Sequence, residues 1–139
     1  MKVILDVNIL LSALIRDSTT RDIIIHSGLN FYFPEPSLQK IRKYQEYIIE
    51  QSGLTKIEYF MVLHTLFKFI KIIPTEEVLK SWDEAKEIME RVDPEDVTFI
   101  AAALSQDNSI IWSEDKDFER QTTIMVLKTK KIIDLSKKL

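Results

Sequence analysis

The sequence contains no cysteine and only two glycines among its 139 residues. The absence of cysteine excludes disulfide bonds and zinc sites built on thiolates. The two glycines are too few for a GxGxxG loop, and the phosphate-binding motif GxxxxGK[ST] is also missing. No apolar run reaches the roughly 18 residues that a membrane span requires. We therefore expect that the protein has no disulfide-bonded fold and no glycine-rich nucleotide-binding loop, and that it is not a membrane protein.

The chain also lacks an excess of positive charge, because 19 Lys and Arg residues stand against 22 Asp and Glu, a net charge of −3. A nucleic-acid role would therefore need a local basic patch or a bound cation. An apolar content of 45% is typical of a compact domain, and we expect a single domain over residues 1–139. Asp6 and Asn8 interrupt the apolar N-terminal run, so we expect no signal peptide and a cytoplasmic location.

Short apolar segments alternate with segments of helical periodicity along the whole chain. Strands are predicted at residues 3–5, 31–33, 72–73, 109–112 and 124–127. Helices are predicted at residues 9–15, 20–27, 37–51, 55–70, 75–91, 94–104 and 130–138, with a short helix within 113–120. Thr55 and Glu58 have the spacing of a capping box, and Asp93 precedes a proline as a helix cap does. This order predicts an α/β fold with a mainly parallel sheet covered by helices on both faces.

Acidic residues stand at three places where such a fold carries functional groups. Asp6 follows the first strand, Asp115 follows the strand at 109–112, and Asp96 lies in the first turn of the helix before that strand. Because ligands bind beyond the carboxyl ends of parallel strands, we expect the three carboxylates to converge there. A hard cation relieves their mutual repulsion, so the pattern predicts a Mg²⁺ or Mn²⁺ site. Such an ion activates water and stabilises charge on a phosphoryl group.

Each acid also has an ordinary structural explanation. Asp6 can cap the helix that follows it, and Asp96 suits the first turn of any helix. Asp115 and Asp117 suit an exposed loop, and Asp93 suits a cap better than a metal ligand. The combination of acids favours the metal site, and no single member does so.

Other catalytic arrangements lack the residues they need. His26 and His64 lie alone in helical segments, and Ser12 and Ser113 have no histidine that would complete a triad. A phosphatase using Asp6 as nucleophile is an alternative, although Asn8 stands where that pattern wants a second Asp. The apolar residues 54–73 fit a core or a dimer interface.

Three segments, VILDVNILLSAL, DPEDVTFIAAAL and IIWSEDKDF, resemble in their order and strand context the PIN-domain family, closely its VapC-like branch. The resemblance covers nearly the whole chain. It implies a twisted parallel sheet flanked by helices, an acidic pocket that binds Mg²⁺ or Mn²⁺, and hydrolysis of RNA, often by the toxin of a toxin–antitoxin pair. It also implies a homodimer. By this resemblance the catalytic and metal-binding acids are Asp6, Asp96 and Asp115, Asp117 is a further metal-binding acid, and Asn8 and Ser113 orient the pocket.

One segment departs from the family pattern. The family places a glutamate in the helix after the second strand, whereas PEPSLQKIRKYQEY has Gln39 and Lys40 there. Glu35 and Glu46 lie nearby but do not fit the register. The loss of a carboxylate predicts weaker cation binding, and Lys40 could take part of the cation's place.

Two functions follow from these patterns. The first is a Mg²⁺- or Mn²⁺-dependent ribonuclease with an antitoxin partner, and the alternative is a catalytically degenerate module that binds RNA or protein. Candidate phosphate-binding residues form two clusters, one of Lys40, Arg42 and Lys43 and one of Lys128, Lys130 and Lys131. An ordinary solvated surface is the simpler explanation for each of these residues taken alone.

Overall fold

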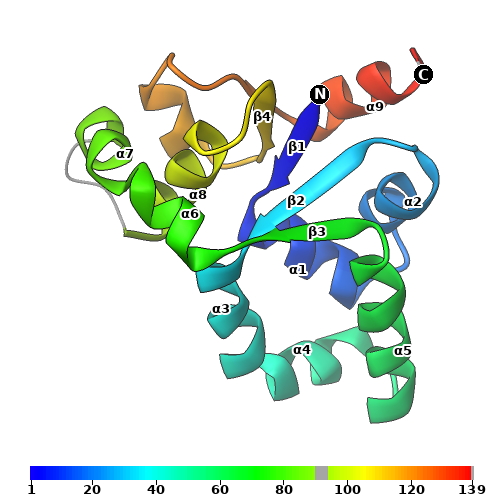
Figure 1. Cartoon of the computed structure of the whole chain (residues 1–139). Coiled ribbons are helices and arrows are strands. Elements are labelled where there is room, and N and C mark those ends of the chain that lie inside the picture. The colour runs from blue at the N-terminus through cyan, green and yellow to red at the C-terminus, as the bar shows by residue number, and fades with distance from the viewer. Residues whose placement is uncertain (90–93, 139) are drawn as a thin grey trace.

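Five parallel strands form the centre of the fold in the computed structural model, which describes residues 1–89 and 94–138 (Figure 1). The strands are β1 (Lys2–Leu5), β2 (Asn30–Pro34), β3 (Ile70–Ile73), β4 (Ser109–Trp112) and β5 (Val126–Leu127). Their order in the sheet is β3-β2-β1-β4-β5, and each neighbouring pair is parallel. The predicted α/β class is confirmed.

Helices connect the strands in three groups. The first group is α1 (Val7–Ile15) and α2 (Thr19–His26), and the second is the turn η1 (Glu35–Ser37) with α3 (Leu38–Lys43), α4 (Gln45–Ser52) and α5 (Lys56–Phe67). The third is α6 (Thr75–Lys80), α7 (Trp82–Met89) and α8 (Pro94–Leu104). The turn η2 (Lys116–Arg120) precedes β5, and α9 (Thr129–Ser136) follows it. Because right-handed crossovers move outward from β1 to β3 and then back to β4, the first two groups and the third lie on opposite faces of the sheet.

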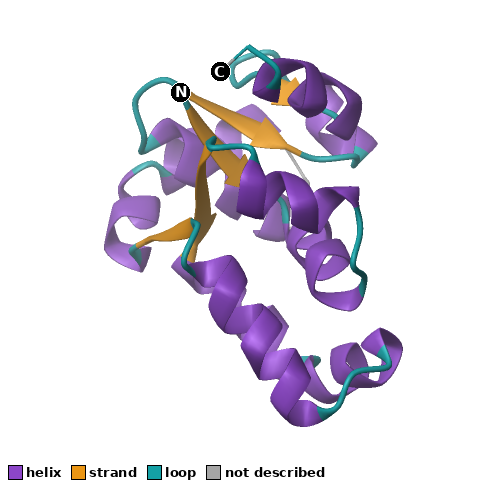
Figure 2. Ribbon diagram, turned by 90° about the vertical axis from the view of Figure 1, so that its right-hand side faces the viewer, coloured by secondary structure: helices purple, strands orange, loops and turns teal. Residues whose placement is uncertain are grey.

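Helices α3, α4 and α5 project from the sheet as an arm, which is clear in the two ribbon views (Figures 1 and 2). Helix α4, at the far end of the arm from the sheet, packs on α1 (Figure 1). Helix α5 begins with the predicted capping box, in which Thr55 and Glu58 each bond the backbone N–H of the other. The arm thus has a defined start and a defined contact with the rest of the chain.

Two predicted helices are each interrupted. The segment 37–51 breaks at Tyr44 (φ −103°, ψ 16°), and the segment 75–91 breaks at Ser81 (φ −106°, ψ 11°). Apolar periodicity continues across both breaks, so a sequence pattern cannot reveal the change of direction. The helix predicted to reach residue 70 ends at Phe67, because Ile70 opens β3. The predicted helix end at Arg91 and the predicted cap at Asp93 lie outside the described residues.

The core places the ends of β1, β4 and α8 rigidly. The alanines of α8 are fully buried against the sheet, where small side chains allow a close approach. The ring of Phe99 on α8 packs edge-on against Phe118 of η2, with centroids 6.4 Å apart. Full burial of such a ring contributes about 1.5–3 kcal/mol. This contact ties η2 to the N-terminal half of α8.

Over the described part of the chain, no helix is both long and apolar enough to cross a bilayer.

Candidate metal centre

The centre is built at the carboxyl ends of β1 and β4. Leu5 and Trp112 are partners in register, and the next residues are Asp6 and Ser113. The backbone N–H of Asp6 continues the ladder by donating to the carbonyl of Trp112 at 3.1 Å. One residue beyond the strands, the Oγ of Ser113 donates a hydrogen bond of 2.6 Å to Oδ2 of Asp6.

The segment after β4 is folded by its own polar side chains. The backbone N–H of Asp115 donates to Ser113 Oγ at 3.0 Å, and the N–H of Asp117 donates to Asp115 Oδ1 at 2.9 Å. Asp115 is thereby the N-cap of η2. These turns hold two acids close together on one short loop.

Three carboxylates come together at this loop. Oxygen atoms of Asp96, Asp115 and Asp117 all lie within 4.8 Å of one another, and all three residues are half-buried. Asp96 comes from the first turn of α8, which the Phe99–Phe118 contact holds against η2. Ligand oxygens on opposite sides of a Mg²⁺ ion stand about 4.2 Å apart. The three carboxylate oxygens therefore suit a hard divalent cation, provided that they move slightly closer together around the ion.

Asp6 lies next to this acid group but is not a member of it among the described residues. Its side chain is 4% exposed, and this burial raises the pKa of the Asp6 carboxyl above its usual 3.8, against the opposing effect of the Ser113 hydrogen bond. The negative charge of Asp115 raises the pKa of Asp6 further. Asp6 also stands at the N-cap of α1 without a side-chain cap hydrogen bond. The sequence predicted Asp6, Asp96, Asp115 and Asp117 as metal-binding acids, and the structure groups the oxygens of the last three, with Asp6 beside Asp115.

A cavity of about 430 Å³ joins Asp6 to Asp115. The exposed side chain of Asn8 lines it, as do Ser12, Thr20, Glu114 and Thr129. Sequence reasoning did not assign these last four to the site. Single hydroxyls spread over α1, α2 and α9 carry no spacing that a sequence pattern could detect.

The PIN domain family model matches residues 4–133 of the chain. The chain belongs to the PIN domain family. It also resembles a chain in the crystal structure of VapBC2 from Rickettsia felis bound to a DNA fragment from their promoter, with a TM-score of 0.68 and 15% sequence identity over 92% of this chain and 98% of that one. At this identity the likeness concerns the fold. Comparison with curated proteins gave no match.

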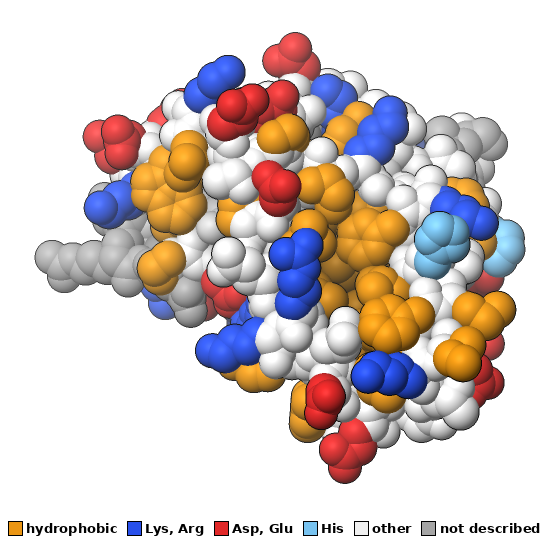
Figure 3. All heavy atoms as spheres, turned by 60° about the horizontal axis from the view of Figure 1, so that its bottom comes forward, with side chains coloured by type: hydrophobic (Ala, Val, Ile, Leu, Met, Phe, Trp, Pro, Cys, Tyr) orange, Lys and Arg blue, Asp and Glu red, His pale blue; other side chains and the backbone are white. Residues whose placement is uncertain are grey.

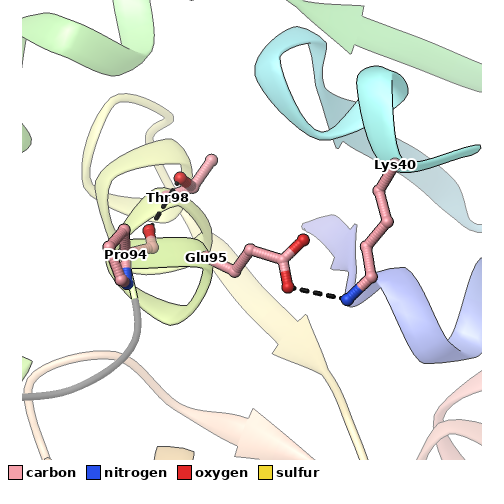
Figure 4. A network of polar contacts seen from close by, with 4 residues as sticks. All are labelled: Lys40, Pro94, Glu95 and Thr98. Atoms are coloured by element: carbon pink, nitrogen blue, oxygen red, sulfur yellow. Dashed lines mark hydrogen bonds and ion pairs between the residues drawn. The ribbon is translucent and has the colours of Figure 1, made fainter. Parts of the chain in front are cut away.

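Lys40 lies in the segment where the resemblance to the family predicts a glutamate. Lys40 on α3 reaches across to α8, and its Nζ lies 2.8 Å from Oε2 of Glu95 (Figure 4). Glu95 directly precedes Asp96, so the ion pair borders the acid group. Both partners are about one third exposed, at 33% and 38%. Helix α3 therefore faces α8 with a positive side chain.

Glu35, the acid nearest to this position after β2, serves another purpose. Its Oε1 accepts hydrogen bonds from the N–H and the Oγ1 of Thr75 at 2.9 and 3.0 Å. These bonds hold the pKa of Glu35 below its usual value and anchor the start of α6 to η1. Glu35 therefore does not replace the missing helix glutamate.

The three basic residues predicted to bind RNA do not share one surface. Lys40 and Lys43 line a cavity between α3 and α8, whereas Arg42 lines a different cavity on the side of α5. On a helix as short as α3, residues 40 and 43 lie on one side and residue 42 on another. Only the first two therefore line the cavity that borders α8.

Proposed function

We propose that this PIN domain is a ribonuclease that depends on Mg²⁺ or Mn²⁺. The observation that supports this is the convergence of Asp96, Asp115 and Asp117, whose carboxylate oxygens suit a hard cation. These residues would hold the ion, which when bound stabilises negative charge on a phosphoryl group and activates water. Asp6 adds negative charge from the adjoining cavity, and Ser113 fixes its orientation. Asn8 lines the same cavity, where its amide would help to orient the pocket.

The test is cleavage of a labelled RNA with Mg²⁺, Mn²⁺ or EDTA. Asp115→Asn keeps the size of the side chain and removes a ligand charge, so cleavage should fall at least a hundredfold. This loss exceeds the tenfold to hundredfold loss that is typical when a residue orienting a metal ligand is replaced. Glu119→Gln is the matched control, because Glu119 is an exposed acid of η2 outside the acid group. Cleavage that persists in EDTA or in Asp115→Asn would remove the proposal.

We also propose that the protein acts as the toxin of a toxin–antitoxin pair and forms a homodimer. The similar structure is that of a VapBC2 assembly. Hydrophobic side chains gather on the face formed by α3, α4 and α5 (Figure 3), and exposed ones there include Tyr47, Ile57, Phe60 and Met61. Such a patch is typical of a protein interface. Light scattering of the wild type and of Ile57→Glu tests the dimer, and co-purification with the product of an adjacent gene tests the antitoxin.

A catalytically degenerate RNA-binding module is the second candidate. The ion pair of Lys40 and Glu95 favours it, because an ammonium group beside the acid group opposes a second cation. Titration calorimetry with Mn²⁺ separates the two candidates. Absence of Mn²⁺ binding together with RNA binding supports the module, and strong Mn²⁺ binding supports the nuclease.

A further inference from the structure

A second cavity lies on the other side of the first turn of α8. Its volume is about 420 Å³, within the range of about 300–1,000 Å³ that small-molecule sites occupy. It is lined by Lys40 and Lys43 of α3, by Trp82 at the start of α7 and by Glu95 of α8. Tyr44, which is 44% exposed, stands where α3 ends.

The aromatic side chains of this cavity are suited to a flat ligand. Trp82 is half-buried and packs against the core, so its ring is held in place. Among the described residues no other ring stacks on it, whereas most large aromatic rings of the core have such a partner. Every nucleobase presents a π-face that stacks on such a side chain.

The charges of the cavity attract a phosphate-bearing ligand. Among the described lining residues, Lys40 and Lys43 stand against the carboxylate of Glu95, which pairs with Lys40, in a chain whose net charge is −3. The Nζ of Lys43 lies 5.4 Å from the centroid of the Tyr44 ring, at the edge of the cavity. Positive charge beside aromatic rings is the arrangement that binds single-stranded nucleic acid.

The cavity and the acid group meet at consecutive residues. Glu95 lines the cavity and the next residue, Asp96, belongs to the acid group, so both sites border the first turn of α8. We propose that the cavity binds one nucleobase of a single RNA strand, next to the phosphate that faces the acid group. The proposal rests on the ribonuclease function above. Gln39 and Glu95 supply the amide and carboxylate groups that can read the edge of the base.

Binding of RNA without cleavage tests this proposal. A fluorescein-labelled 2′-O-methyl pentanucleotide is titrated in EDTA, and its Kd is measured by anisotropy. Trp82→Ala should weaken binding about tenfold to a hundredfold, the effect of losing one base stack. Phe69→Ala is the matched control, because Phe69 is a 42% exposed aromatic outside the cavity, and it should change Kd less than twofold. Lys43→Glu, at an exposed position, gives a second weakened variant should Trp82→Ala fail a circular-dichroism check of the fold.

Intrinsic fluorescence distinguishes direct stacking of a base on Trp82 from a purely structural role of this residue. The chain has two tryptophans, and Trp112 is fully buried. An unlabelled pentanucleotide should therefore quench Trp82 selectively, and the quenching should vanish in Trp82→Phe. Equal Kd values in the wild type, Trp82→Ala and Lys43→Glu would overturn the proposal, and so would failure of the wild type to bind at millimolar RNA. Because the assay contains no metal, loss of cleavage with intact base binding would count against the nuclease alone.

Discussion

The hydroxyl of Ser113 links two acids of the site that lie far apart in the sequence. It donates to Oδ2 of Asp6, 107 positions away, at 2.6 Å, and it accepts from the backbone N–H of Asp115 at 3.0 Å. Ser113 itself is 1% exposed. One buried hydroxyl therefore orients the carboxylate at the end of β1 and the loop that carries two members of the acid group.

Ser113→Ala should lower both Mn²⁺ affinity and RNA cleavage about tenfold to a hundredfold, as is usual when a partner that orients a metal-site acid is removed. The physical reason is that Asp6 loses its only side-chain donor among the described residues. Ser105→Ala removes a hydroxyl that bonds Ala102 within α8 and is the control. Unchanged Mn²⁺ affinity in Ser113→Ala would show that the hydroxyl has no orienting role.

Asp6→Asn should alter the pH dependence of stability in the absence of metal. Burial raises the pKa of Asp6 in the folded protein, so the fold retains a proton that the unfolded chain releases. The free energy of unfolding of the wild type should therefore fall as pH rises from 3.8 through the higher folded pKa, and Asp6→Asn should lack this contribution. Urea denaturation of both proteins from pH 3 to pH 7 measures the difference. A difference that is constant over this range would contradict the expectation.

Lys40→Glu should tighten Mn²⁺ binding and lower the melting temperature of the metal-free protein. The substitution places a carboxylate opposite Glu95, so two like charges repel until a cation binds between them. Lys43→Glu changes the net charge equally from an exposed position on the same helix. Calorimetry should show tighter binding for the first variant only. Equal tightening in both would mean that overall charge, and not the position of Lys40, controls the affinity.

Glu35→Gln should weaken the fold slightly and leave cleavage unchanged, because Glu35 bonds Thr75 at the start of α6 and lies away from the acid group. The lowered pKa of Glu35 means that its contribution is present above pH 4.5 and is lost as pH falls through the folded pKa. Thermal melts at pH 7 and pH 3 measure this, with the exposed Glu46→Gln as the control. A loss of cleavage in Glu35→Gln would instead place this acid in the active centre.

Local patterns were enough to predict the strands β1 and β4 and the acids that follow them. A buried parallel strand is a continuous apolar run, so the carboxylate of Asp6 interrupts a pattern that depends only on neighbouring residues. The capping box of α5 was predictable for the same reason, since its two partners are three residues apart. The resemblance of three segments to PIN domains likewise required only their order in the chain.

By itself, then, the sequence determined the α/β class, the family and the acids available to the candidate site. Only the tertiary structure decided that the oxygens of Asp96, Asp115 and Asp117 lie within 4.8 Å of one another while Asp6 bonds Ser113, and that Lys40 meets Glu95 across 55 positions. It also decided that the helix after η1 breaks at Tyr44 and that α3 thereby borders a cavity with Trp82. Periodicity and capping depend on residues a few positions apart, whereas the distance between two side chains from different elements depends on strand order and helix packing. Those distances are set only when the whole chain has folded.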